Sequence, residues 1–200
     1  MYCQFTAFDQ WEDMARILIF SSFVAGSNVG GALGLKALTT LGHEVSLVPT
    51  TLLGRHPGWG APGGGAVPIN LFKGMIEGLE ANGIVSTADV ILTGYFADHH
   101  QVDRVDELLE QYRYLPDQMI CVDPVLGDDE PGLYVRPEVA EAIAEKLVPR
   151  ANMLTPNAFE LKWLRLSDAT IKPYALVCET SVERGRDLGI RAQRGDELFE

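Results

Sequence analysis

Acidic side chains are concentrated in one short segment of this sequence. Four of the eight residues at 123–130 are Asp or Glu, and the first of them, Asp123, directly follows an apolar run. Carboxylates this close repel one another, and a hard cation that bridges to phosphate oxygens would relieve the repulsion. A solvated acidic loop would explain Asp129 and Glu130 equally well. It suits Asp123 less, because that residue ends a segment that we expect to be a buried strand.

A second group of polar residues follows the next apolar segment. Thr155 is suited to cap the start of a helix, and Pro156 to be its first helical residue. Capping does not explain why Asn157 and Glu160 accompany them. If both segments follow parallel strands, these side chains lie at the same sheet edge as Asp123.

Small residues at 25–31 follow the first apolar run and precede a helical pattern. They would let a ligand approach the backbone and a helix N-terminus, although a tight strand-to-helix turn is an equally good explanation. Neither a GxGxxG fingerprint nor a GxxxxGK[ST] phosphate loop occurs in the sequence. This argues against a standard dinucleotide reductase and a Walker-type NTPase.

The adjacent residues Asp98, His99 and His100 raise the question of a metal site. Neighbouring histidines at the start of a helix should not share a face, and the sequence indicates no third ligand. We therefore expect solvated loop residues here.

Composition limits the class of protein. The formal net charge is −12, which argues against nucleic acid or an anionic membrane as the main partner. No apolar run approaches the roughly 18 residues of a membrane span. The three cysteines are far apart, which is typical of a reduced compartment. Residues 1–13 have no basic region typical of a signal peptide, and we interpret them either as a leader or as the result of an upstream start codon, before a natural start at Met14.

Apolar segments alternate between strand-like and helix-like patterns. The predicted strands are 16–22, 44–51, 89–93, 118–123, 152–154 and 174–177, and the predicted helices are 30–41, 69–82, 102–112, 139–147 and 157–164. Residues 188–200 should form a hairpin that turns at 194–196. Residues 52–68 hold six glycines and three prolines and predict a mobile lid without helix or strand.

This alternation predicts an α/β fold: a mostly parallel, doubly wound sheet with helices on both faces, formed as one domain by residues 1–200. Ligands bind beyond the carboxyl ends of the strands in such sheets.

Taken in this order, the motifs resemble those of the pyridoxal kinases, which belong to the ribokinase-like superfamily. Residues 17–24 resemble the opening strand with its QSHV serine, and residues 54–60 resemble the SNHTGYG loop that covers the substrate. Residues 93–95 match TGY. Residues 121–128 (CVDPVLGD) match CDPVMGD, and residues 155–160 match TPNxxE.

The resemblance implies ATP-dependent phosphorylation of pyridoxal at its 5′-hydroxyl, with Mg²⁺ and K⁺, in a cytoplasmic homodimer. The residues implied to hold the vitamin are Ser22, His56, Pro57, Gly58 and Tyr95. Those implied to bind ATP are Asp123, Thr155, Asn157, Glu160, Thr180 and Ser181. The metal would be held by Asp123, Asp128, Thr155 and Glu160.

Four departures from the family pattern stand out. Phe23 and Pro57 replace a common histidine and threonine, and residues 165–173 are too few for the helix expected there. The GTGD-type motif, which supplies the family's catalytic aspartate, has no counterpart, so no catalytic base is assigned. We expect that the working protein has further residues near Arg165 and beyond Glu200. The alternatives are a hydroxymethylpyrimidine or sugar kinase of the superfamily, or a non-catalytic vitamin-binding relative.

Overall fold

A computed structural model describes residues 14–113, 115, 117–184 and 187–199. The proposed leader, residues 1–13, lies outside this range. The strands are β1 (Arg16–Val24), β2 (Glu44–Leu53), β3 (Gly64–Ala66), β4 (Val90–Thr93), β5 (Met119–Val122), β6 (Gly127–Asp128), β7 (Gly132–Leu133), β8 (Met153–Leu154), β9 (Leu176–Arg184), β10 (Asp187–Arg194) and β11 (Glu197–Phe199). The helices are α1 (Gly30–Thr40), α2 (Ile69–Ala81), α3 (His99–Gln111), α4 (Pro137–Ala142) and α5 (Ala158–Leu166).

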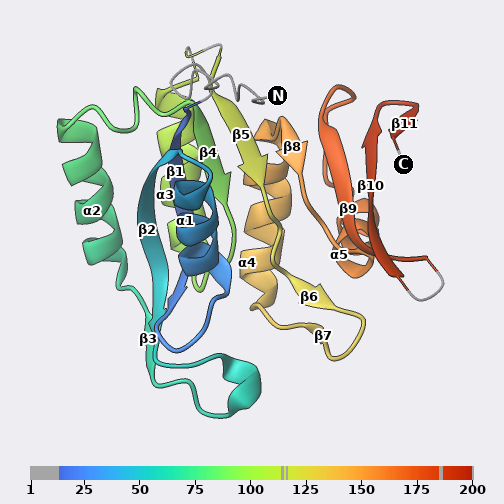
Figure 1. Cartoon of the computed structure of the whole chain (residues 1–200), viewed down its shortest axis with the longest axis horizontal. Coiled ribbons are helices and arrows are strands. Elements are labelled where there is room, and N and C mark those ends of the chain that lie inside the picture. Colours follow the sequence, from blue (N-terminus) through green and yellow to red (C-terminus); the bar gives the residue numbers. More distant parts are fainter. Residues whose placement is uncertain (1–13, 114, 116, 185–186, 200) are drawn as a thin grey trace, which may run out of the picture.

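The main sheet has the order β11-β10-β9-β8-β5-β4-β1-β2-β3 (Figure 1). Its central strands, from β2 to β9, pair in parallel. The edge strands β3, β10 and β11 pair antiparallel. The predicted α/β fold is therefore confirmed, including the hairpin at residues 194–196. That all 200 residues form one domain stays a prediction.

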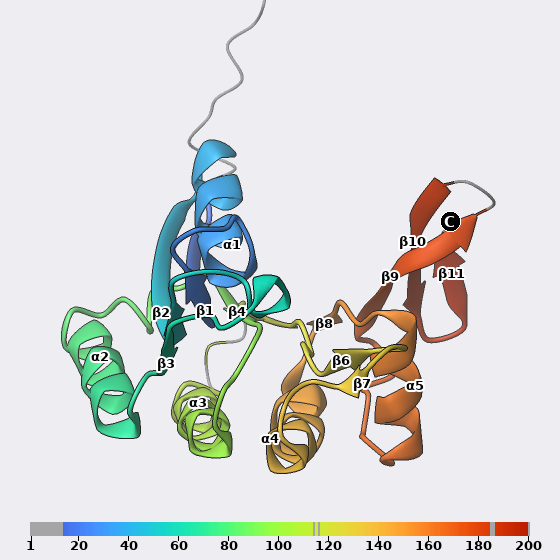
Figure 2. The same ribbon diagram turned by 90° about the horizontal axis from the view of Figure 1, so that it is seen from below.

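Helices cover both faces of the sheet, as predicted. Helices α2, α3, α4 and α5 lie on one side, and α1 lies on the other, over β1 and β2 (Figure 2). The larger layer contains most of the core, which includes Phe20 of β1, Phe72 of α2 and Leu108 of α3, all fully buried. None of the helices in the described part of the chain is long and apolar enough to cross a membrane.

The prediction that residues 52–68 form a loop without helix or strand is wrong in part. Strand β2 continues to Leu53, a 3-10 turn occupies Pro57–Trp59, and β3 returns antiparallel to β2. Glycine makes this return possible, because Gly64 has φ +85° and a side chain there would lie 2.1 Å from the Leu52 carbonyl oxygen. The segment is thus a hairpin that projects beyond the sheet.

Two further elements differ from the prediction. The short antiparallel pair β6–β7 was not predicted, because two-residue strands have no periodicity. Strand β9 continues to Arg184, well past its predicted end. The segment between α5 and β9 has no helix, as its length indicated.

Gln101 joins three parts of the fold. This fully buried side chain on α3 donates through Nε2 to the carbonyl oxygens of Thr50 and Val67, at 2.9 and 3.0 Å. Its Oε1 accepts from the Ala97 backbone N–H at 3.3 Å. Thr50 and Val67 stand on either side of the projecting hairpin. One amide therefore fixes both ends of the hairpin to helix α3.

We predict that Gln101→Leu lowers the free energy of unfolding by about 2–4 kcal/mol, since it removes three hydrogen bonds in a buried site and leaves the Val67 carbonyl and the Ala97 N–H without that partner, while the Thr50 carbonyl keeps its bond from the Val67 N–H. Urea denaturation measures the change. Gln111→Leu on the exposed end of the same helix is the matched control and should change stability by less than about 0.5 kcal/mol. Equal effects of the two substitutions would contradict the role assigned to Gln101.

Candidate functional site

A cavity of about 910 Å³ lies at the carboxyl ends of β1, β4 and β5. It is lined by all five residues that were expected to hold the vitamin: Ser22, His56, Pro57, Gly58 and Tyr95. Asp123 lines the same cavity. These residues come from β1, the projecting hairpin and the segments after β4 and β5. The structure therefore brings the expected substrate residues together, while their individual roles stay predictions.

Ser22 contacts the first residue of α1. It is 8% exposed, and a side chain on Gly30 would lie 2.2 Å from its hydroxyl oxygen. Gly30 has φ +58°, which favours glycine. The small residues at 25–31 thus let the helix begin directly against the serine.

His56 begins the 3-10 turn of the hairpin. Its Nδ1 accepts a hydrogen bond from the Gly58 backbone N–H at 3.1 Å, so Nε2 is the nitrogen left to face a ligand. The His56 and Trp59 rings lie 5.9 Å apart. Pro57 is the first residue of the turn, a position where a missing N–H costs nothing. The replacement of threonine by proline therefore suits the local backbone.

Asp123 is a largely buried carboxylate, and no basic side chain is among the described residues that shift its pKa. Burial raises its pKa to about 6, and a hydrogen bond from the Thr155 hydroxyl opposes this rise. Beside it, the buried Thr93 hydroxyl has no hydrogen-bond partner among the described residues. Thr93 and Asp123 are also neighbours in the backbone, since the Asp123 N–H donates to the Thr93 carbonyl at 2.9 Å.

Glu160 and Asn157 form a capping box at the start of α5, and each also contacts the acidic loop. Glu160, 4% exposed, accepts from the backbone N–H groups of Leu126 and Asn157, both at 2.9 Å. The Asn157 amide donates to the Gly127 carbonyl at 2.9 Å. Burial raises the pKa of Glu160 to about 7, although these N–H groups oppose the rise. The pair therefore clamps the loop after β5 onto α5.

Of the predicted ATP and metal residues, Asp123 alone lines the cavity; Thr155, Asn157, Glu160, Asp128, Thr180 and Ser181 lie outside its lining. Asp128 is exposed, and its carboxylate accepts from the Asp129 N–H at 2.9 Å. The Thr180 N–H donates to the Pro156 carbonyl at 2.8 Å, which places it beside the turn that holds Thr155. Ser181 is an exposed residue with φ +57° at an irregularity in the β9–β10 pairing.

Tyr134 is a cavity residue that the sequence analysis missed. It follows β7 and reaches the cavity together with Pro131. Burial and the nearby carboxylates of Glu160 and Asp123 raise its pKa. The Pro131-Gly132 dipeptide was the available signal, because it indicates a turn that returns the chain toward the acidic loop.

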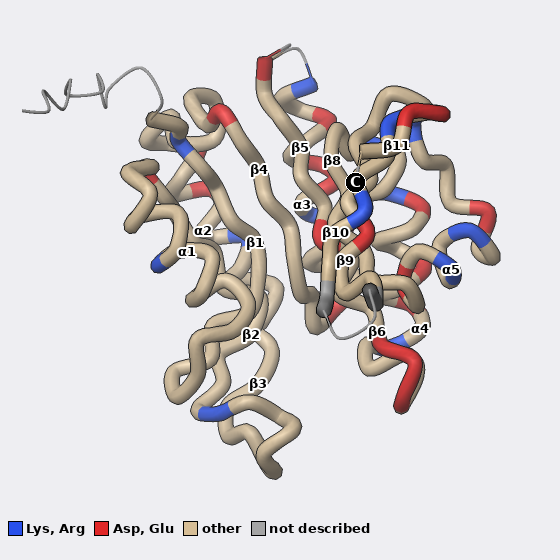
Figure 3. Tube along the Cα trace, turned by 45° about the vertical axis from the view of Figure 1, so that its right-hand side comes forward, with Lys and Arg blue, Asp and Glu red and all other residues tan. Residues whose placement is uncertain are grey.

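Charge is distributed unevenly around the cavity. Residues 14–66, from β1 to β3, contain only four Lys, Arg, Asp or Glu residues. The acidic residues gather in the other half of the fold (Figure 3). Asp123 is the only carboxylate among the described residues that line the cavity. The part of the cavity at Asp123 is therefore the part that could attract a cation.

The sequence of residues 78–182 matches the family model described as phosphomethylpyrimidine kinase. The chain belongs to this family. Among curated members, it is 38% identical over 146 residues to a pyridoxine/pyridoxal/pyridoxamine kinase of Bordetella avium, covering 72% of this chain and 49% of that protein. It is 34% identical over 168 residues to a pyridoxal kinase of Deinococcus radiodurans, covering 80% and 56%. The chain thus spans about half the length of the curated relatives it matches.

Solved structures agree with this assignment. A pyridoxal kinase from Entamoeba histolytica superposes with a TM-score of 0.81 at 26% identity, covering 92% of this chain and 70% of that one. A pyridoxal kinase from Leishmania donovani in complex with ADP gives 0.74 at 27% identity, covering 88% and 65%. The expected resemblance to pyridoxal kinases of the ribokinase-like superfamily is confirmed.

The raised pKa values predict how stability changes with pH. In the folded protein the pKa values of Asp123 and Glu160 are raised to about 6 and about 7, whereas the ordinary pKa values of these groups are 3.8 and 4.5. Between about pH 4 and pH 7 the folded state therefore binds more protons than the unfolded state, so the free energy of unfolding should fall as pH rises. The fall should end above about pH 7.

Chemical denaturation of the ligand-free protein at several pH values measures this slope. Glu160→Gln should flatten it, because the variant has no carboxyl group at this site to titrate. Glu77→Gln, an exposed position on α2, should keep the wild-type slope and controls for the change in net charge. A slope that Glu160→Gln leaves unchanged would refute this assignment.

Gly30→Ala should destabilise the protein through both backbone and contact. The positive φ alone costs about 1–2 kcal/mol, and the clash with Ser22 adds about 1–3 kcal/mol. Gly42→Ala separates the two effects, since Gly42 also has positive φ but open space around it. If urea denaturation gives equal losses for both variants, Gly30 does not support Ser22 by close contact.

Proposed function

We propose that this protein phosphorylates pyridoxal at its 5′-hydroxyl with ATP, giving pyridoxal 5′-phosphate. The main support is the convergence of Ser22, His56 and Tyr95, from three separate segments, on the cavity that also contains Asp123. Relatives named as pyridoxal kinases support the choice of substrate. The activity is proposed for the whole protein, of which this chain corresponds to about half the length of its relatives.

The cavity suits the vitamin in shape and chemistry. Its volume of about 910 Å³ can hold a pyridine ring together with the phosphates of a nucleotide. Ser22 and the Nε2 of His56 would bind polar groups of the ring. The apolar parts of Tyr95 and Leu53 would pack against its faces.

The residues around Asp123 fit the Mg²⁺ that the family implies. Asp123 is a partly buried carboxylate with a raised pKa and no ion pair within the described part of the chain, and the Thr155 and Thr93 hydroxyls add hard oxygen ligands. We propose that Asp123 and Thr155 hold the metal, which when bound would neutralise phosphate charge. Glu160 would act through the clamp that positions residues 126–127. Asp128 as a metal ligand, Thr180 and Ser181 as nucleotide contacts, and the use of K⁺ stay predictions.

The contribution of these residues to catalysis would be positioning, because phosphoryl transfer requires little covalent chemistry from the protein. The hairpin that contains His56 would cover the substrate and exclude water, so that water does not hydrolyse the ATP. No residue of this chain is proposed as the base that accepts the hydroxyl proton. A cytoplasmic homodimer is proposed from the resemblance to the family alone.

The test is ATP-dependent formation of pyridoxal 5′-phosphate, with hydroxymethylpyrimidine and ribose assayed in parallel and pyridoxal binding measured by calorimetry. Asp123→Asn should lower kcat by about 100-fold or more, since it removes the charge that holds the metal. Ser22→Ala should raise KM for pyridoxal about 10-fold, which corresponds to one lost hydrogen bond. Asp129→Asn, an exposed carboxylate of the same loop, is the control and should leave both constants unchanged.

Turnover of pyridoxal with these effects would support the proposal. Turnover of hydroxymethylpyrimidine in preference to pyridoxal would overturn the substrate and keep the fold. That second candidate is favoured by one observation, the description of the matching family model. Binding of pyridoxal without turnover would instead indicate a vitamin-binding relative.

A further inference from the structure

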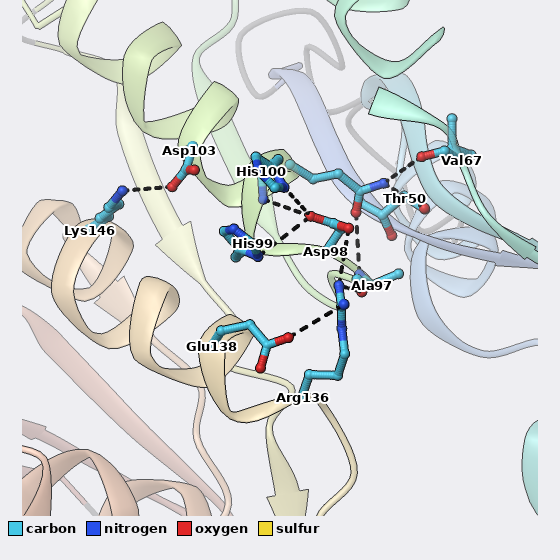
Figure 4. A network of polar contacts seen from close by, with 11 residues as sticks. Thr50, Val67, Ala97, Asp98, His99, His100, Asp103, Arg136, Glu138 and Lys146 are labelled. Atoms are coloured by element: carbon cyan, nitrogen blue, oxygen red, sulfur yellow. Dashed lines mark hydrogen bonds and ion pairs between the residues drawn. The ribbon is translucent and has the colours of Figure 1, made fainter. Parts of the chain in front are cut away.

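We propose that Asp98, His99 and His100 form a binding site for a divalent transition metal such as Zn²⁺, separate from the kinase site. The three residues stand at the start of α3, and none of them lines the cavity (Figure 4). One ligand atom from each lies within 4.8 Å of the others. The proposal rests on this geometry and does not depend on the proposed function.

The expectation that the two histidines cannot share a face is wrong. Their rings lie 3.9 Å apart, tilted by 36°. Both Nδ1 atoms turn toward the same oxygen, Oδ1 of Asp98, at 3.7 Å for His99 and 2.8 Å for His100. The spacing rule for helical faces fails here because Asp98 precedes the helix in an extended conformation and bends back over its first turn.

The donor set is the one that zinc prefers. Two imidazole nitrogens and a carboxylate favour Zn²⁺, Co²⁺ or Ni²⁺ over Mg²⁺ and Ca²⁺, which prefer oxygen. Three protein ligands leave a fourth position for water.

His99 supplies an independent observation. Its Nδ1 is buried and has no hydrogen-bond partner among the described residues. A buried imidazole nitrogen without a partner is unfavourable, and a metal bound between the two rings would satisfy it. The same ion would take the place of the 2.8 Å contact between the His100 Nδ1 and the Asp98 Oδ1.

Neighbouring residues orient the carboxylate. Arg136 donates to Oδ2 of Asp98 at 3.0 Å, which leaves Oδ1 for the histidines. It also donates to the Ala97 carbonyl at 3.1 Å, and Glu138 pairs with it at 3.4 Å. The guanidinium charge opposes a cation, while the Glu138 carboxylate offsets part of that charge. Since Arg136 directly precedes α4, the metal would strengthen the contact between the starts of α3 and α4.

The experiment is calorimetric titration of the tag-free protein with Zn²⁺, followed by Co²⁺ absorption spectroscopy. We expect one equivalent to bind, and His99→Ala and His100→Ala each to weaken the affinity at least 10-fold. Asp98→Asn should weaken it while keeping an oxygen that can cap the helix. The Co²⁺ spectrum should lack a thiolate charge-transfer band, which would exclude the cysteines as ligands.

His43→Ala is the matched control, because this histidine lies elsewhere, at the turn before β2, and should leave affinity unchanged. Circular dichroism of each metal-free variant shows whether it has folded. Asp98→Asn keeps the proposal testable if a histidine variant is unstable. Absence of Zn²⁺ binding, or binding that folded His99→Ala, His100→Ala and Asp98→Asn all retain, would overturn the proposal.

Discussion

The arrangement of the site depends on the hydrogen bonds that the Glu160 carboxylate accepts. One oxygen accepts from the Leu126 N–H and the other from the Asn157 N–H, so the acidic loop and the start of α5 are held by a single side chain. Parallel strands alone would bring both segments to one edge of the sheet, but they would not fix the distance between them. The clamp sets that distance, and Thr155 can then reach Asp123.

The clamp is favourable only because the backbone satisfies the charge. A carboxyl group buried without partners would be neutral or would destabilise the fold. In this protein burial and backbone donors oppose each other, and the outcome is a pKa near neutrality. The motif that caps α5 therefore places a second carboxyl group with a raised pKa close to Asp123. A cation near Asp123 would stabilise the charged forms of both groups, since it would attract both carboxylates.

Much of this arrangement could be predicted from the sequence, and the failures have physical reasons. Apolar runs ending in polar residues predicted the strands, and the carboxyl-edge rule predicted that Ser22, Tyr95 and Asp123 meet. Composition failed for the hairpin at 54–66, because glycine disfavours strands on average but permits the close pairing at Gly64. Tyr134 was missed because it directly follows β7, a strand of two residues without a repeating pattern, and only the Pro131-Gly132 turn signal pointed to it.

The histidines show a different limit of sequence patterns. Helical spacing describes side chains on a regular helix, whereas His99 and His100 occupy its first turn beside a capping carboxylate. There the direction of a side chain is set by the nearest charge rather than by the helical period. Gln101, one residue later, already points into the core and holds the base of the hairpin. Of these three consecutive residues, His99 and His100 belong to the polar cluster with Asp98, whereas Gln101 is buried and holds the hairpin. The start of α3 is therefore connected both to the polar cluster and to the hairpin.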